Sequence, residues 1–133
     1  MQDESRETVL IVDDERLVAD TLALVLKRRG WQAVTAYSAM EALRRVQEFQ
    51  PAAAILDVVL PDFNGIELAA QIQHRLPGCQ ILLLSGQPEA AELLEAAEAR
   101  GKSFEVMVKP VDPSELLSRL SRVSATVVPI NSR

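Results

Sequence analysis

The sequence predicts an α/β fold in which five parallel strands form one doubly wound (βα)5 sheet with helices on both faces. Five short apolar runs alternate along the chain with five longer amphipathic segments. Several runs, such as residues 9–12 and 81–84, are apolar at successive positions, which is typical of strands buried on both faces of a parallel sheet. Strict alternation of this kind indicates right-handed crossovers within a single sheet. The length of 133 residues is that of one ordinary domain.

The predicted strands are Thr8–Val12, Ala33–Tyr37, Ala53–Leu56, Gln80–Leu84 and Phe104–Val108. The first helix is expected over Glu15–Arg29, and Gly30 is its stop signal. Its predicted inward stripe consists of Leu17, Val18, Leu22, Val25 and Leu26. The second helix is expected over Ser38–Phe49, because Ser38 and Glu41 have capping-box spacing and Pro51 follows.

The remaining helices also begin and end at recognisable residues. Asn64 and Glu67 open the third helix, which is expected to direct Ile66, Leu68 and Ile72 inward. The fourth, Pro88–Arg100, is rich in alanine and glutamate and stops at Gly101. The fifth opens at Asp112 with a cap residue, a proline and a glutamate in turn. The chain thus divides into a polar leader (1–7), one domain (8–123) and a C-terminal tail (124–133).

Composition and charge exclude several classes of function. A net charge of −5 with no basic run argues against direct binding of nucleic acid. The polar N-terminus is unlike a signal peptide, and no apolar run approaches the roughly 20 residues that span a bilayer. The single cysteine, Cys79, cannot form an internal disulfide, and no Cys/His cluster offers a zinc site. We therefore expect a cytoplasmic protein that does not contact a membrane.

Polar side chains follow four of the five predicted strands. Asp13-Asp14-Glu15 follows the first strand, Asp57 the third, Ser85-Gly86 the fourth and Lys109-Pro110 the fifth. In a doubly wound sheet the binding crevice lies at the carboxyl ends of the strands, near the point where strand order reverses. We expect three carboxylates, a hydroxyl and an ammonium group to meet there.

This set of groups suits phosphoryl transfer. Carboxylates crowded into one crevice repel each other, and Mg²⁺ prefers oxygen ligands of this kind together with phosphate. A lysine and a serine hydroxyl could then hold the equatorial oxygens of a transferring phosphoryl group. No GxxxxGK[ST] motif is present to cradle a nucleotide, so a carboxylate nucleophile that forms an acyl phosphate is the natural alternative.

Four motifs in the same order and spacing make the sequence resemble the response-regulator receiver family. They are residues 10–15 (LIVDDE), 55–65 (ILDVVLPDFNG), 84–86 (LSG) and 108–110 (VKP), and the resemblance covers about Thr8 to Val123. The resemblance implies the flavodoxin-like strand order 2-1-3-4-5. It also implies a phosphorylation-dependent signalling switch, a phosphoacceptor that assists its own phosphotransfer and dephosphorylation without being a conventional enzyme.

The resemblance assigns roles to the residues of the crevice. Asp57 would be the phosphorylated residue, Asp14 a direct Mg²⁺ ligand, Asp13 a ligand through a bound water, and the backbone carbonyl of Val59 a further ligand. The donor in this family is a phosphohistidine on a histidine kinase or a histidine phosphotransfer protein, and a downstream protein partner reads the result.

Two further residues complete the implied site. Ser85 would donate a hydrogen bond to the phosphoryl group, and Lys109 would pair with it. The Lys109–Pro110 peptide is expected to be cis, a conformation that costs about 0.5–1 kcal/mol before proline.

The sequence departs from the family at positions that tune the response. Val106 stands where receivers usually carry an aromatic residue, and Phe104 lies two positions earlier on the same face. Val111 replaces the usual phenylalanine after Lys-Pro. Val59 and Gln87 occupy positions that flank the phosphoryl group in the family. An apolar Val59 cannot orient an attacking water whereas Gln87 could, so we expect a longer-lived phospho-form if Val59 dominates.

Several alternatives stay open at this stage. A phosphatase with an aspartyl-phosphate intermediate would need DxDx[TV] after the first strand, which residues 11–15 (IVDDE) do not supply. A pseudo-receiver that only binds partners is disfavoured by the complete set of site residues. A single-domain regulator is the preferred interpretation, and a receiver fragment of a larger response regulator or hybrid histidine kinase is the alternative. A phosphorylation-dependent homodimer is a further alternative. The sequence names neither the cognate kinase nor the pathway.

Overall fold

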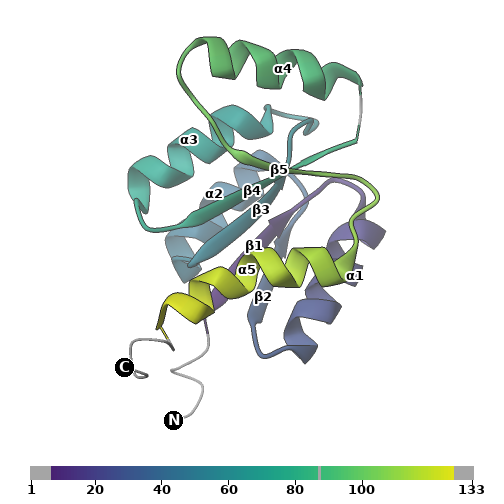
Figure 1. Ribbon diagram of the computed structural model, residues 1–133, viewed down its shortest axis with the longest axis vertical. Coiled ribbons are helices and arrows are strands. Elements are labelled where there is room, and N and C mark those ends of the chain that lie inside the picture. The colour runs from purple at the N-terminus through teal and green to yellow at the C-terminus, as the bar shows by residue number, and fades with distance from the viewer. Residues whose placement is uncertain (1–6, 87, 128–133) are drawn as a thin grey trace.

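The computed structural model describes residues 7–86 and 88–127 and contains one parallel sheet flanked by helices (Figure 1). The strands are β1 (Thr8–Val12), β2 (Gln32–Ala36), β3 (Ala53–Asp57), β4 (Gln80–Ser85) and β5 (Glu105–Val108). The helices are α1 (Arg16–Arg28), α2 (Ala39–Phe49), α3 (Gly65–Arg75), α4 (Pro88–Ala99) and α5 (Pro113–Val127). The sheet has the order β2-β1-β3-β4-β5, which confirms the predicted doubly wound fold and its strand order.

The two faces of the sheet carry separate apolar cores. Helices α2, α3 and α4 cover one face and α1 and α5 the other, as Figure 1 shows. Within β1, Leu10 and Val12 belong to the first core, whereas Val9 and Ile11 belong to the second. Both faces of the strand are therefore buried, which accounts for the continuous apolar runs in the sequence. No helix within the described part of the chain has both the length and the apolar character needed to cross a membrane.

Helix α1 is rotated relative to the stripe that the sequence predicted. Its buried residues are Ala19, Leu22, Ala23 and Leu26. These follow i, i+3, i+4, i+7 spacing and form the face that packs on the sheet. Leu17 precedes this face by two residues, about 200° around the helix, and its exposed fraction is 81%. The prediction that Leu17 faces inward was wrong, and an apolar side chain is left on the surface.

Other differences are confined to the ends of elements. Tyr37, expected to end the second strand, lies just outside β2; its ring stacks under Arg16 and its hydroxyl donates to Asp20 at 2.7 Å. Glu15 is the N-cap residue of α1 rather than its first turn. Helix α5 continues to Val127, four residues beyond the boundary expected at 123, in a stretch without glycine or proline before Pro129.

Candidate functional site

The register of the central strands places two carboxylates side by side. In the β1–β3 pair, Val12 lies opposite Leu56, so Asp13 and Asp57 are the next residues along neighbouring strands. Parallel neighbours lie about 4.8 Å apart, so no long side chain is needed to bring the two groups together. β1 and β3 are also the strands between which the chain order reverses. The carboxylates thus occupy the crevice position typical of open α/β sheets.

Lys109 reaches this pair from the edge of the sheet. It follows β5, and its N–H donates to the Ser85 carbonyl at 3.0 Å. A Cβ added at Gly86 would lie 2.8 Å from the Lys109 Cδ, so the glycine leaves room for the lysine stem to cross the end of β4. The Nζ atom then lies 2.8 Å from Asp13 Oδ2 and 3.0 Å from Asp57 Oδ2. The predicted convergence of strand ends is confirmed for these residues.

Burial sets the electrostatics of this cluster. Asp13 is fully buried and Asp57 is 3% exposed. Burial raises the pKa of Asp57, and the charge of Asp13 acts in the same direction, while the hydrogen bond from Lys109 opposes both. Burial alone would lower the pKa of Lys109, but its ion pair with Asp13 and its hydrogen bond to Asp57 raise it. The ammonium group stays charged and offsets two carboxylates that would otherwise repel each other.

The carboxylates also form a donor set suited to a hard cation. Oxygens of Asp13, Asp14 and Asp57 all lie within 4.8 Å of one another, and Asp14 is exposed to solvent. Opposite ligands across a Mg²⁺ ion are about 4 Å apart, since each Mg–O distance is about 2.0–2.1 Å. An all-oxygen set at this spacing, open to water on the Asp14 side, fits Mg²⁺ with water ligands better than a softer metal.

The segment after β3 approaches the cluster closely. The Val59 N–H donates to Asp57 Oδ1 at 3.3 Å, and Val59 forms an isolated bridge with Asn64. Gly65 N–H donates to the Val58 carbonyl at 2.7 Å. A Cβ at Gly65 would overlap the Asp57 carbonyl oxygen, so only glycine fits here. The backbone around Val59 is thereby held near the Asp57 carboxylate.

The other residues predicted for the site lie at varying distances from it. Ser85 is half-buried at the end of β4, opposite Val108 in the ladder and adjacent to the Lys109 backbone. The Lys109–Pro110 peptide is cis, as expected. Val106 is half-buried and, like Phe104 just before β5, packs against the core under α2, α3 and α4. Gln87 lies outside the described residues.

Three features of the site were not expected from the sequence. Glu15 Oε1 lies 3.3 Å from Lys109 Nζ, which makes it a third acidic partner of the lysine. The position of Glu15 directly after Asp13-Asp14 was the sequence signal that could have indicated this contact.

The second feature is Asp62, which accepts hydrogen bonds from the backbone N–H groups of Ala39 and Met40. The third feature is an apolar pocket beside Lys109.

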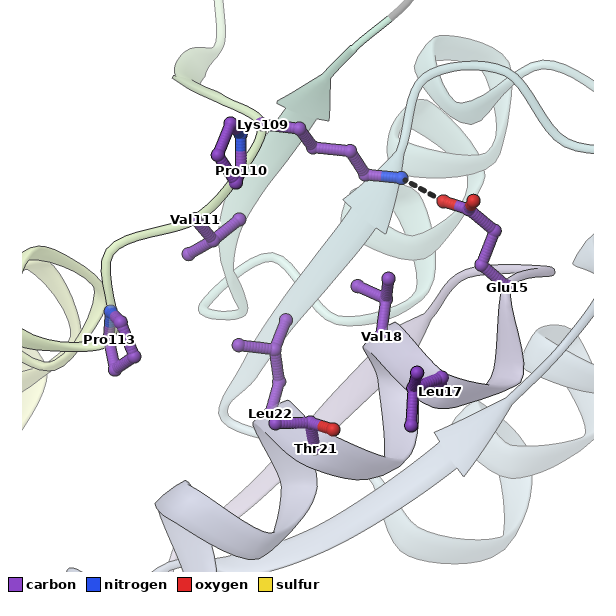
Figure 2. A pocket seen from close by; sticks show the side chains of 9 residues that line it. All are labelled: Glu15, Leu17, Val18, Thr21, Leu22, Lys109, Pro110, Val111 and Pro113. Atoms are coloured by element: carbon purple, nitrogen blue, oxygen red, sulfur yellow. Dashed lines mark hydrogen bonds and ion pairs between the residues drawn. The ribbon is translucent and has the colours of Figure 1, made fainter.

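This pocket lies between α1 and the loop that joins β5 to α5. Its volume is about 460 Å³, and Figure 2 shows Lys109 extending along its rim to Glu15. The lining residues are Glu15, Leu17, Val18, Thr21, Leu22, Lys109, Pro110, Val111 and Pro113. Apart from Glu15, Thr21 and Lys109 they are apolar, and Leu17 is the most exposed large apolar residue of the described chain. The small side chain of Val111 contributes to the wall.

Known proteins resemble this chain over most of its length. Residues 9–121 match the family model described as "Response regulator receiver domain". The chain is 32% identical over 117 residues to "Chemotaxis protein CheY" of Thermotoga maritima, a match that spans 87% of this chain and 96% of that protein. It is 36% identical over 118 residues to "DNA-binding transcriptional regulator NtrC" of Azospirillum brasilense, covering 89% of this chain and 24% of that protein.

Solved structures of receiver domains have the same fold. The CheY-like response regulator receiver domain protein of Methanospirillum hungatei JF-1 superposes with a TM-score of 0.77 at 26% identity, covering 89% of this chain and 93% of that one. The chain belongs to the response-regulator receiver family. It spans about half or less of the length of most of the curated regulators that it matches, such as 47% of "Probable transcriptional regulatory protein TcrX" of Mycobacterium tuberculosis.

Proposed function

We propose that this receiver domain accepts a phosphoryl group on Asp57 from a phosphohistidine and acts as a phosphorylation-dependent switch. The observation that carries the proposal is the position of the Asp57 carboxylate. It is almost fully buried at the reversal point of the sheet, 3.0 Å from Lys109 Nζ and within the cluster formed with Asp13 and Asp14. Asp57 would attack phosphorus, the P–N bond to the donor imidazole would break, and an acyl phosphate would form.

The neighbouring groups have complementary roles in this proposal. Lys109 would move its ion pair from the Asp57 carboxylate to the phosphoryl oxygens, and the Ser85 hydroxyl would donate a hydrogen bond to one of those oxygens. Asp13, Asp14, Asp57 and the Val59 carbonyl would hold Mg²⁺, with Asp13 acting through water. When bound, the ion supplies positive charge that offsets the charge of the phosphoryl group and the carboxylates.

The response would depend on how the doubly charged phosphoryl group redistributes these contacts. The phosphoryl group would draw Ser85 and Lys109 toward it. Because α4 follows Ser85 and β5 precedes Lys109, this movement would bias both elements toward a second arrangement. Val106 offers no ring to turn inward, so we infer that this coupling proceeds without the usual aromatic residue at that position. Val59 and Gln87 would set the lifetime of the phospho-form. Replacing Val59 with asparagine is expected to accelerate dephosphorylation, and an unchanged or slower rate would contradict this role.

The apolar pocket supports a protein as the phosphodonor. It adjoins Lys109, so a partner packed against Leu17 and Val111 would also reach the Asp57 crevice. We infer that a histidine kinase or phosphotransfer protein docks here and that a downstream protein reads the phospho-form, with no direct contact to nucleic acid or membrane and a cytoplasmic location. The same phosphorylation could also promote homodimerisation of the domain.

A second candidate concerns the setting of the domain. A single-domain regulator is supported by the match to nearly the full length of CheY. A receiver within a larger regulator is supported by the match to 24% of NtrC and 47% of TcrX. The length of the natural gene product, read from the genomic reading frame, distinguishes the two. A frame that continues into an output domain would remove the single-domain proposal and leave the phosphoacceptor chemistry unchanged.

Intact mass spectrometry tests the phosphoacceptor proposal. The protein is incubated with acetyl phosphate with and without Mg²⁺, together with Asp57→Asn and the control Asp112→Asn. Asp112 is an exposed cap of α5 that accepts from the Ser114 N–H, a bond that asparagine can keep. We expect wild type and the control to gain one phosphoryl group only with Mg²⁺, and Asp57→Asn to gain none. A folded wild-type protein that gains nothing would favour the pseudo-receiver alternative.

A further inference from the structure

The N-terminus of α2 is capped from two separate segments of the chain. The first N–H groups of any helix lack partners within the helix. The Ser38 hydroxyl accepts from the Glu41 N–H at 3.2 Å, as a local N-cap does. The two preceding N–H groups, of Ala39 and Met40, donate to Oδ1 and Oδ2 of Asp62 at 2.9 and 3.1 Å. Asp62 is 22 to 23 residues away in the sequence, so its carboxylate is a tertiary contact as well as a cap.

Asp62 belongs to the segment that leaves the phosphoacceptor. β3 ends at Asp57 and α3 begins at Gly65, so Asp62 lies near the middle of the connection. The two ends of this connection are fixed by the close packing of Gly65 on the Asp57 backbone and by the bridge between Val59 and Asn64. Leu60 is buried in the core, whereas residues 61–63, its outer part, make no backbone hydrogen bond to the sheet in the described part of the chain. The bonds from Asp62 therefore join that part to a second, rigid element.

Apolar packing does little to hold the outer part of this connection. Pro61, Asp62 and Phe63 are all exposed, and Phe63 is among the exposed large apolar residues at 38%. By contrast, a carboxylate at a helix N-terminus forms charge-assisted hydrogen bonds and is stabilised by the helix dipole. The Ala39 N–H, the strongest of the influences on this group, lowers the pKa of Asp62, so the carboxylate is ionised at neutral pH.

We propose that Asp62 is a positioning residue for the metal-binding side of the phosphoacceptor site. By attaching the β3–α3 connection to α2, it restricts the backbone of Val59, whose N–H contacts Asp57 Oδ1 and whose carbonyl is assigned to Mg²⁺. The inference rests on the proposed function, because it assumes that Mg²⁺ binds at this site. Among the described residues the Asp62 carboxylate accepts from Ala39 and Met40 and is not part of the cluster of Asp13, Asp14 and Asp57.

A Mg²⁺ titration followed by NMR tests this role without any phosphorylation. The shifts of backbone amides near Asp57 give the dissociation constant for wild type, Asp62→Ala, Asp62→Asn and Ser38→Ala. Ser38→Ala removes a cap from the same helix but leaves the β3–α3 connection attached, so it reports any effect of a weaker α2 alone. Replacing a group that orients a metal ligand typically weakens metal affinity 10–100-fold. We therefore expect Asp62→Ala to bind Mg²⁺ about tenfold more weakly than wild type. Asp62→Asn keeps one of the two oxygens that accept from α2, so its Mg²⁺ affinity should lie between those of wild type and Asp62→Ala. The affinity of Ser38→Ala should stay within about twofold of wild type.

The outcomes separate this inference from the proposed function. If wild type shows no saturable Mg²⁺ shift, the magnesium site itself is wrong and the role of Asp62 is lost with it. Wild-type binding with unchanged affinity in Asp62→Ala would overturn the positioning role alone. Equal weakening in Asp62→Ala and Ser38→Ala would also overturn it, because the stability of α2 would then explain both. Should Asp62→Ala fail to fold, Asp62→Asn decides, and an affinity equal to that of wild type would contradict the proposal.

Discussion

Replacing Lys109 with methionine removes the cation that lies between two buried carboxylates. The ammonium group is 2.8 Å from Asp13 and 3.0 Å from Asp57, whose side chains are 0% and 4% exposed. Methionine has a similar length and can follow the same path across Gly86. The substitution therefore changes the charge with little change in packing. Two carboxylates would be left together with no counter-ion in the absence of metal.

The expected cost follows from the burial of the pair. Removing one partner from a buried ion pair typically costs 3–5 kcal/mol. The Lys109 side chain is 16% exposed, so water can partly replace it. Asp57, whose pKa is already raised by burial, can also take up a proton. Both effects favour the lower end of the range, and we expect a loss of about 3 kcal/mol in the free energy of unfolding without Mg²⁺.

Urea denaturation at neutral pH measures this loss, with Arg100→Met as the control. Arg100 pairs with Glu67 at 3.6 Å on the surface, where the two side chains are 56% and 40% exposed. Exposed pairs contribute about 0–1 kcal/mol, so the control should remain near wild type. A ligand at about 100 times its dissociation constant stabilises the folded state by about 2.7 kcal/mol. Because the lysine and Mg²⁺ share the same carboxylates, Mg²⁺ should stabilise Lys109→Met more than wild type.

Two results would refute this reasoning. A cost for Lys109→Met no larger than that for Arg100→Met would mean that the carboxylates are hydrated or not paired with the lysine. An equal Mg²⁺-dependent gain in wild type and Lys109→Met would mean that the metal does not bind at the carboxylates that Lys109 contacts.

Three further predictions concern stability and partner recognition. Burial raises the pKa of the Asp57 carboxyl in the fold, so its ionisation opposes folding. Without Mg²⁺, Asp57→Asn should therefore raise the melting temperature at neutral pH. This gain should vanish as the pH falls through the raised pKa of Asp57 in the fold toward 3.8, the ordinary pKa of an aspartate. A gain in melting temperature that persists in acid would contradict this. Gly65→Ala should lower the free energy of unfolding in urea by about 3 kcal/mol, because its Cβ would overlap the backbone. Gly78→Ala has open space around its Cβ and should leave it near wild type. Equal denaturation midpoints for the two variants would contradict the close approach of Gly65 to the Asp57 backbone. Leu17→Ala should slow phosphorylation by a histidine phosphotransfer protein but not by acetyl phosphate, whereas Leu24→Ala, exposed on the same helix outside the pocket, should change neither rate.

The convergence of the site could be predicted because strand ends determine it. In a parallel sheet, residues that directly follow neighbouring strands share one edge whatever the loops do. Apolar runs located those strand ends to within one residue at Asp13, Asp57 and Lys109. The register then placed Asp13 beside Asp57, and the glycine after β4 left a path for the lysine.

Contacts between distant segments could not be predicted in the same way. The exposure of Leu17 depends on how α1 is rotated on the sheet, and Leu17 and Leu22 are equally apolar in the sequence. Asp62 looks like an ordinary turn residue before Asn-Gly, because its partners belong to a helix that begins 23 residues earlier. The pocket beside Lys109 likewise depends on the separation between α1 and the β5–α5 loop.

The most direct test of the phosphoacceptor assignment identifies the residue that carries the phosphoryl group. Protein treated briefly with acetyl phosphate and Mg²⁺ is reduced with borohydride, which converts an aspartyl phosphate to the alcohol, and is then digested with trypsin. The tryptic peptide 46–75 contains Asp57, whereas Asp13 and Asp14 lie in a separate peptide. We predict that fragmentation places the reduced residue at Asp57. Reduction at Asp13, Asp14 or Asp62 instead would contradict the account.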